Sequence, residues 1–321
     1  MFEKSVPLYR QIIREAWKIA WHKKNMWIFG LFSALIATGG ALEIFSRNLN
    51  WVFTPHLPIF WNSGSLIWKM DYSFWPMLIM LILLILGLVA FLVFMSVRSF
   101  IALITATDKY KTDEKVDLNK VWRAGEKNFG SVLGEVVLFK VIIVGAGFLS
   151  TFPLWFIWTG NNWQGWVWLY PLIFVLGMAV AVVASFLMVF TAAYLTLKRY
   201  SFGKSLKMAW KLFLSNWLVS LEMALVIFLV NMLFGLIYVA ATVIVALPTF
   251  LFVVLGAFMV LPILSNTAIV IGSLICLVML MWTAGFVGSF HTIAWSLLFK
   301  RMEKGTAVSK LHRLVNQLKR N

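Results

Sequence analysis

Five polar side chains interrupt the long apolar runs of this sequence, and together they could form a buried charge pair or line an intramembrane polar pathway. The chain has 321 residues, of which 62% are hydrophobic, so several apolar runs are long enough to lie in a membrane. An ionisable group at the membrane centre costs about 2.5–3.5 kcal/mol to insert, so those that occur there are candidates for a functional site. The five candidates are Lys140, Glu135, Glu222, Asn231 and His291.

Lys140 is the strongest of these candidates, because it lies near the middle of its apolar run and needs a charged partner or a wet cavity. Glu135 precedes it by five residues, which at about 100° per residue places the carboxylate on another face of the helix. Glu222 is the better partner for Lys140. Asn231 and His291 would extend a polar lining around this pair.

The same residues could also have only structural roles, without belonging to a functional site. Glu135 and Glu222 fall one to two turns into their expected helices, where the positive end of the helix dipole stabilises a carboxylate. The long side chain of Lys140 would carry its amine toward the membrane surface. His291 lies near the end of the last apolar run, where a histidine more often packs or meets the interface.

Motifs of enzymes are missing from the rest of the sequence. The histidines stand apart with no H-x-x-x-H or C-x-x-C spacing, and Cys276 is the one cysteine, so no metal site is expected. Neither a G-x-x-x-x-G-K-[ST] loop nor a G-x-S-x-G elbow occurs. We therefore expect no enzyme, no cofactor and no metal; an intramembrane lipid enzyme is a less favoured alternative.

The composition indicates an all-α, multi-pass membrane protein. Soluble domains are roughly 45–50% apolar and about 25% charged, whereas this chain is 62% hydrophobic and 12% charged. A membrane helix needs about 20 apolar residues, and any excess length is absorbed by tilting or by continuation into the cytoplasm. The stretch 251–264 begins just after Pro248, contains Pro262, and is predicted to be an interfacial or re-entrant segment on the outer side. Six spans are predicted, at 26–44, 74–97, 131–158, 167–197, 217–246 and 266–298.

The positive charges predict the orientation of these spans. Of 28 Lys and Arg residues, 25 fall on four alternate segments outside the apolar runs: the N-terminal segment before residue 26, residues 98–127, residues 198–211 and the segment from residue 300 onward. Because Lys and Arg mark the cytoplasmic side, both termini are predicted to be cytoplasmic, in a bacterial plasma (inner) membrane. Tryptophans gather in the two outer segments, where an interfacial belt explains them better than a sugar- or peptide-binding platform. The net charge of +16 thus indicates topology, and nucleic acid is not an expected partner.

Short amphipathic runs precede the first, third and fifth spans. Each carries a tryptophan followed by a basic residue, and each places apolar and basic residues on opposite faces at helical spacing. We predict interfacial helices whose apolar faces rest at the acyl boundary and whose basic faces contact anionic headgroups. The basic residues are Arg10, Arg14, Lys18, Lys120, Arg123, Lys127, Lys204, Lys207 and Lys211.

The same pattern predicts the domain organisation. One transmembrane domain, 1–300, would consist of three repeats, each an interfacial helix plus a helical hairpin, at about 1–107, 108–197 and 198–300. A basic amphipathic tail, 301–321, follows. Internal repeats occur in many transport proteins but also in proteins that transport nothing.

The runs REAWKIAWHKKNMWIFGLFSALIATGG, VWRAGEKNFG and MAWKLFLSNW resemble a family. It comprises bacterial six-span membrane proteins of the glycerophosphoryl diester phosphodiesterase membrane-domain type and their uncharacterised relatives. The enzyme domain of fused family members is a barrel, which needs about 250 residues, whereas the loops here reach about 30. The resemblance therefore implies the membrane domain alone, and it transfers no catalytic residue.

Two functions follow as expectations. The first is a non-enzymatic membrane-embedded scaffold or accessory unit that contacts anionic lipids through its basic interfacial helices, with an unidentified membrane-protein partner. The alternative is a small transporter or permease subunit with an intramembrane polar pathway around Lys140 and Glu222. The substrate or partner and the oligomeric state are not readable from the sequence.

Overall fold

The computed structural model describes residues 8–37, 74–110, 118–158 and 169–305. Every described element is a helix, which confirms the all-α prediction. Five of these helices are long and apolar enough to cross a membrane, so a multi-pass membrane protein is supported. The five are α6 (Phe74–Tyr110), α8 (Phe129–Trp158), α9 (Leu169–Ala193), α11 (Trp217–Phe258) and α12 (Pro262–Glu303).

Shorter helices join the long ones. Three are amphipathic or basic and end a few residues before the next helix begins: α1 (Leu8–His22), α7 (Leu118–Lys127) and α10 (Phe202–Ser215). The apolar helix α2 (Met26–Ala37) follows α1, and a π-helical turn, η2 (Tyr194–Lys198), ends α9. Arg199, after η2, adopts a left-handed conformation with φ 54°, which turns the chain toward α10.

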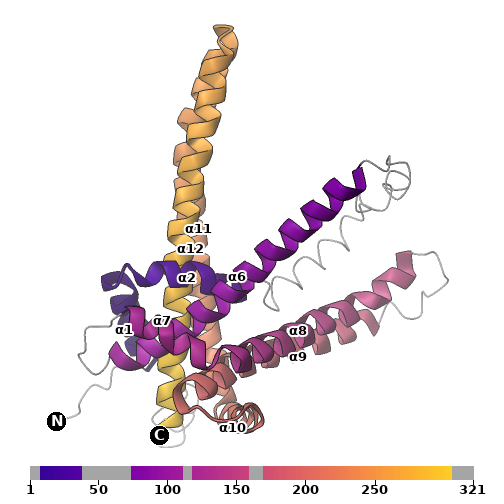
Figure 1. The fold of residues 1–321 in the computed structure, drawn as a ribbon, viewed down its shortest axis with the longest axis vertical. Helices are drawn as coiled ribbons and strands as arrows, with labels where there is room; N and C mark the ends of the chain where they lie inside the picture. Colours follow the sequence, from indigo (N-terminus) through magenta and orange to yellow (C-terminus); the bar gives the residue numbers. More distant parts are fainter. Residues whose placement is uncertain (1–7, 38–73, 111–117, 159–168, 306–321) are drawn as a thin grey trace, which may run out of the picture.

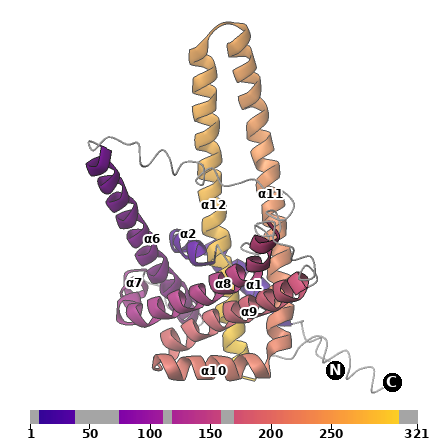
Figure 2. The ribbon, with the colours of Figure 1, turned by 90° about the vertical axis from the view of Figure 1, so that its right-hand side faces the viewer.

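Three arms diverge from a common base, as Figures 1 and 2 show. One arm is α6, the second is α8 packed along α9, and the third is α11 packed along α12. The short helices lie around the base, where the buried residues of the long helices also gather. We define the base as α1, α2, α7, α10, η2 and the adjoining segments 96–107, 129–146, 181–193, 217–227 and 285–303.

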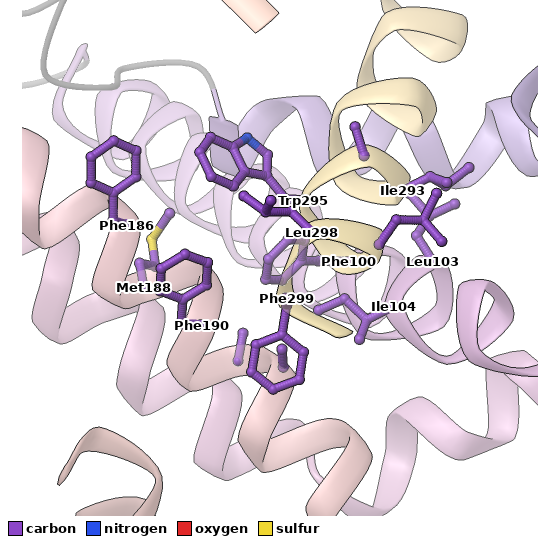
Figure 3. Packing of buried hydrophobic residues seen from close by; sticks show 14 of the residues in the cluster. Phe100, Leu103, Ile104, Phe186, Met188, Phe190, Ile293, Trp295, Leu298 and Phe299 are labelled. Atoms are coloured by element: carbon purple, nitrogen blue, oxygen red, sulfur yellow. The ribbon is translucent and has the colours of Figure 1, made fainter. Parts of the chain in front are cut away.

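Aromatic and branched aliphatic side chains fill the base. Figure 3 shows side chains of α6, α9 and α12 meeting there. The ring of Phe299 on α12 contacts Tyr194 edge-on at 4.8 Å between centroids, and Trp295 contacts Phe186 at 5.5 Å. These contacts join the C-terminal ends of helices that are far apart in the sequence. The labelled residues are Phe100, Leu103 and Ile104 of α6, Phe186, Met188 and Phe190 of α9, and Ile293, Trp295, Leu298 and Phe299 of α12.

The arms, in contrast, present apolar side chains outward. None of residues 75–95 of α6 is buried. In the part of the third arm outside the base, residues 228–284, only Gly256 and Gly272 are buried. Both glycines let α11 and α12 approach closely, because a Cβ on Gly272 would lie 2.5 Å from the Thr249 hydroxyl. A helix of 42 residues is about 63 Å long, about twice the hydrocarbon thickness. The C-terminal part of α12 lies in the base.

The prediction that 251–264 forms a separate interfacial or re-entrant segment is wrong. These residues end α11, make a short turn at 259–261 and begin α12. The interior proline Pro248 removes one helical hydrogen bond without ending α11, as membrane helices tolerate. Pro262 stands in the first turn of α12, where its missing N–H has no partner to lose. Val260 takes the left-handed conformation (φ 54°) that reverses the chain.

Other boundaries of the predicted spans also change. The span at 74–97 continues as one helix to Tyr110, because its C-terminal part packs into the base. The span at 26–44 is described as helix only over Met26–Ala37, and its remainder lies outside the described residues. Most of the outer tryptophans and most of the tail 301–321 lie outside them too. Six spans, the three repeats and the orientation stay predictions.

Candidate functional site

Helix α1 separates an apolar face from a basic face. Ile12, Ala16 and Ile19 are fully or almost fully buried, at 0–1% exposure. Arg10, Arg14 and Lys18 follow one another at four-residue spacing and are exposed. Side chains at this spacing lie on one face of a helix, so the three charges form one stripe.

Helices α10 and α7 repeat this arrangement. On α10, Ala209, Leu212 and Phe213 are buried, while Lys204, Lys207 and Lys211 are exposed. On α7, Val121 is buried and Arg123 is exposed; the side chains of Lys120 and Lys127 lie outside the description. The amphipathic helices predicted from the sequence are thus present. Together, the exposed basic residues are Arg10, Arg14, Lys18, Arg123, Lys204, Lys207 and Lys211, and we call them the basic faces.

The apolar face of α1 is covered by protein, and the position of the short helices at an acyl boundary stays a prediction. Trp27 and Ile19 of the α1–α2 unit lie in the same buried cluster as Ile293 of α12. The indole N–H of Trp27 donates to the carbonyl oxygen of Ala20 at 2.7 Å. The long helices continue into the base and supply an apolar surface there, so the short helices bury their apolar faces against it.

A second set of basic residues makes ion pairs that hold the base together. Lys300 of α12 pairs with Asp108 of α6 at 2.7 Å, and Lys198 pairs with Glu303 at 2.8 Å. The guanidinium of Arg301 donates to Gln11 at 2.7 Å and to Glu15 at 3.1 Å, which ties α1 to the last turn of α12.

Arg98 on α6 holds α7 in the same way. Its guanidinium donates to Glu126 at 2.7 Å and lies over the Trp122 ring, 4.2 Å from the centroid. The basic faces differ from these residues, because none of their seven side chains forms an ion pair with another described residue. Lys204 alone makes a cation–π contact, 4.0 Å from the Tyr200 centroid. Their charge therefore remains available to a ligand.

A tight crossing of α2 over α12 sets the position of α1. Gly30 lies so close to α12 that a Cβ there would fall 2.0 Å from the carbonyl oxygen of Gly285. The hydroxyl of Ser289 donates to the carbonyl oxygen of Met26 at 2.8 Å across the same crossing. Small residues commonly permit such close approach between membrane helices.

Four of the five intramembrane candidates lie in the base and only Asn231 lies in an arm, and the five divide between two pairs of helices. Glu135 and Lys140 lie on α8, and Glu222, Asn231 and His291 lie on α11 and α12. Glu135 is fully buried beside the main chain of Ala192 on α9, with no well-formed hydrogen bond to a described residue. Lys140 is half-buried. A pairing of Lys140 with Glu222 stays a prediction.

Two of the other candidates, Glu222 and His291, form hydrogen bonds to aromatic side chains. The hydroxyl of Tyr9 on α1 donates to the Glu222 carboxylate on α11. The ring of His291 accepts a hydrogen bond from the Trp295 indole one turn along α12, at 3.2 Å, consistent with a packing role. Asn231 is half-buried, and its amide oxygen has no hydrogen-bond partner within the described part of the chain.

The contacts of Tyr9 and Trp17 with α11 were not predicted from the sequence. With Ile13 these two residues stand at four-residue spacing, beside the stripe of Arg10 and Arg14, and they form the line along which α1 meets α11. That spacing was the available signal. Within the described residues, no group of three His, Cys, Asp or Glu side chains gathers as a metal site would require.

Comparison with known proteins finds no family model, no curated protein and no solved structure that matches this chain. The resemblance to the phosphodiesterase-type membrane domains therefore stays an expectation.

Proposed function

We propose that this chain is a non-enzymatic bacterial plasma-membrane protein, a scaffold or accessory unit that contacts anionic lipids through its basic faces. The observation that carries the proposal is the division of its basic residues into two sets. Four join helices of the base, whereas seven project from the short helices without an ion pair among the described residues. Charges left unpaired on the short helices suit a surface of opposite charge.

The foot of the exposed apolar arms is the place where such a surface would lie. The arms expose apolar side chains along their length, as a hydrocarbon environment favours, and the basic faces belong to helices packed at their foot. Each Lys or Arg near an anionic membrane surface contributes about 1 kcal/mol of attraction. The three lysines of α10 would therefore contribute up to about 3 kcal/mol.

The test is the lipid composition around the protein. Wild type and the variant Lys204→Gln/Lys207→Gln/Lys211→Gln are extracted with styrene–maleic acid copolymer, and the co-extracted anionic and zwitterionic lipids are quantified. We expect anionic lipid to be enriched around the wild type and less so around the Gln variant. The charge-preserving control, Lys204→Arg/Lys207→Arg/Lys211→Arg, should keep the wild-type enrichment. Equal enrichment in wild type and the Gln variant would contradict the proposal.

A further inference from the structure

A cleft opens between α1 and α11. Its volume is about 520 Å³, and its accessible wall is apolar. This volume falls within the range of about 300–1,000 Å³ that is common for small-molecule sites. The cleft is lined by Tyr9, Arg10, Ile13, Arg14, Trp17 and Val226.

Both ends of the cleft are fixed by contacts between α1 and the α11/α12 arm. At one end the Tyr9 hydroxyl donates to Glu222. At the other end the Trp17 ring stacks on Phe234 of α11, with centroids 5.7 Å apart, and meets Phe286 of α12 edge-on at 5.1 Å. Ile13 and Val226 lie in the cleft wall along with these end residues. The cleft is therefore a fixed feature of the packing.

Arg10 lies beside Tyr9 at one end of the cleft and Arg14 lies beside Ile13 in its middle, and the direction of α1 relative to the arm is defined. Arg301 in the last turn of α12 bonds to Gln11 and Glu15, so the N-terminal half of α1 lies at the far end of the base. Trp17 meets Phe286, about four turns closer to the exposed arm. Beyond Phe234, the exposed surface of α11 continues along the arm with Ile237 and Ile244.

We propose that this cleft binds one anionic phospholipid, an inference that rests on the proposed function and names its ligand at one site. The guanidinium groups of Arg10 and Arg14 hold the phosphate, since planar guanidinium forks match phosphate oxygens and neither group has an ion pair among the described residues. An acyl chain lies over Ile13, Trp17 and Val226 and continues past Phe234 along the exposed Ile237 and Ile244 of α11. The apolar wall between two exposed arginines and an apolar arm fits a lipid better than a water-soluble anion.

The experiment measures retained lipid by native mass spectrometry. Detergent-solubilised protein is mixed with equimolar phosphatidylglycerol and phosphatidylcholine, and the fraction carrying one phosphatidylglycerol is recorded. We expect Arg10→Gln/Arg14→Gln to lower the phosphatidylglycerol affinity by about tenfold or more. Its matched control, Lys204→Gln/Lys207→Gln, removes the same charge from α10 and should retain the single lipid. Because all four residues are exposed, these replacements leave the packing intact.

A second variant tests the apolar wall with the charges in place. Val226→Phe fills the cleft, and we expect the protein to lose the retained lipid although Arg10 and Arg14 remain. Val226→Leu, a smaller replacement, is measured as well in case the phenylalanine ring lowers the thermal unfolding temperature. Retention of the lipid by correctly folded Val226→Phe and Val226→Leu would overturn the proposal.

Two further results separate the cleft from the wider proposal. Equal loss in the α1 and α10 double variants would overturn the cleft and leave a diffuse attraction of the basic faces for anionic lipid. No preference for phosphatidylglycerol in any variant, wild type included, would contradict both. Displacement of the lipid by millimolar inorganic phosphate would show that phosphate alone is the ligand and would overturn the lipid assignment.

Discussion

Gly30→Ala tests the helix crossing that positions the base. The new Cβ would lie 2.0 Å from the Gly285 carbonyl oxygen, 2.2 Å from the Ser289 hydroxyl and 2.6 Å from the Ser289 nitrogen. Real Cβ atoms almost never lie within 3.0 Å of such atoms, so α2 and α12 must separate by about 1 Å. Overpacking of this kind costs about 1–3 kcal/mol.

A second contribution comes from the hydrogen bond across the crossing. The separation stretches the 2.8 Å bond from Ser289 to the Met26 carbonyl, which is worth about 1 kcal/mol. Because the obstacle is backbone, which cannot rotate away, we expect the upper part of the overpacking range. Together the two effects cost about 3–4 kcal/mol, and the gain of about 0.5–1 kcal/mol from alanine in place of a helical glycine leaves a net loss of about 3 kcal/mol in the free energy of unfolding.

Thermal unfolding in detergent provides the assay, with Gly87→Ala and Gly235→Ala as matched controls. Both control glycines lie in long helices with no atom within 4 Å of the added Cβ. Alanine in place of a helical glycine stabilises by about 0.5–1 kcal/mol, so the controls should unfold at or slightly above the wild-type temperature. A Gly30→Ala protein as stable as the Gly87→Ala protein would refute the packing described here.

Three other perturbations have defined outcomes. Tyr9→Phe removes the donor to the half-buried Glu222 and should lower the unfolding free energy by about 1–3 kcal/mol, read from thermal unfolding; an unchanged stability would contradict the bond. Arg98→Gln loses the contacts with Glu126 and Trp122 and should speed amide hydrogen exchange in α7 but not in the α11/α12 arm; uniform exchange rates would argue against a local role. Glu135→Met replaces a buried carboxyl that has no well-formed hydrogen bond to a described residue, and should leave stability unchanged or raise it by about 1–3 kcal/mol; a clear loss would indicate a partner that this account lacks.

The sequence predicted the features that depend on composition and local periodicity. Apolar length identified the long helices, and helical spacing of Arg10, Arg14 and Lys18 identified the amphipathic α1 with its basic face exposed. The prediction of a separate segment at 251–264 relied on Pro248 and Pro262. It failed because the position of a proline alone does not show whether a membrane helix continues.

Tertiary contacts between distant segments lay beyond sequence reasoning. The bond between Tyr9 and Glu222 joins residues 213 positions apart, and the contact of Gly30 with Gly285 joins two helices at opposite ends of the chain. The apolar residues of α1 predict that one face of this helix is buried in an apolar environment. A protein core and an acyl boundary, however, require the same apolar pattern. Only the packing of the base distinguishes between them.

The central claim is that the basic faces of α1, α7 and α10 lie at one membrane surface, at the foot of arms that cross to the other side. The direct test is single-cysteine labelling with a membrane-impermeant maleimide in right-side-out and inside-out vesicles. Cys276→Ser provides the background, with Lys18→Cys, Arg123→Cys and Lys207→Cys on the basic faces. Val260→Cys lies at the exposed tip of the α11/α12 arm.

We predict that all three cysteines on the basic faces react in inside-out vesicles and are protected in right-side-out vesicles, whereas the tip cysteine shows no cytoplasmic labelling. Reaction of the Lys18, Arg123 and Lys207 positions from different sides of the membrane would contradict the claim, because the basic faces could then not share one anionic surface.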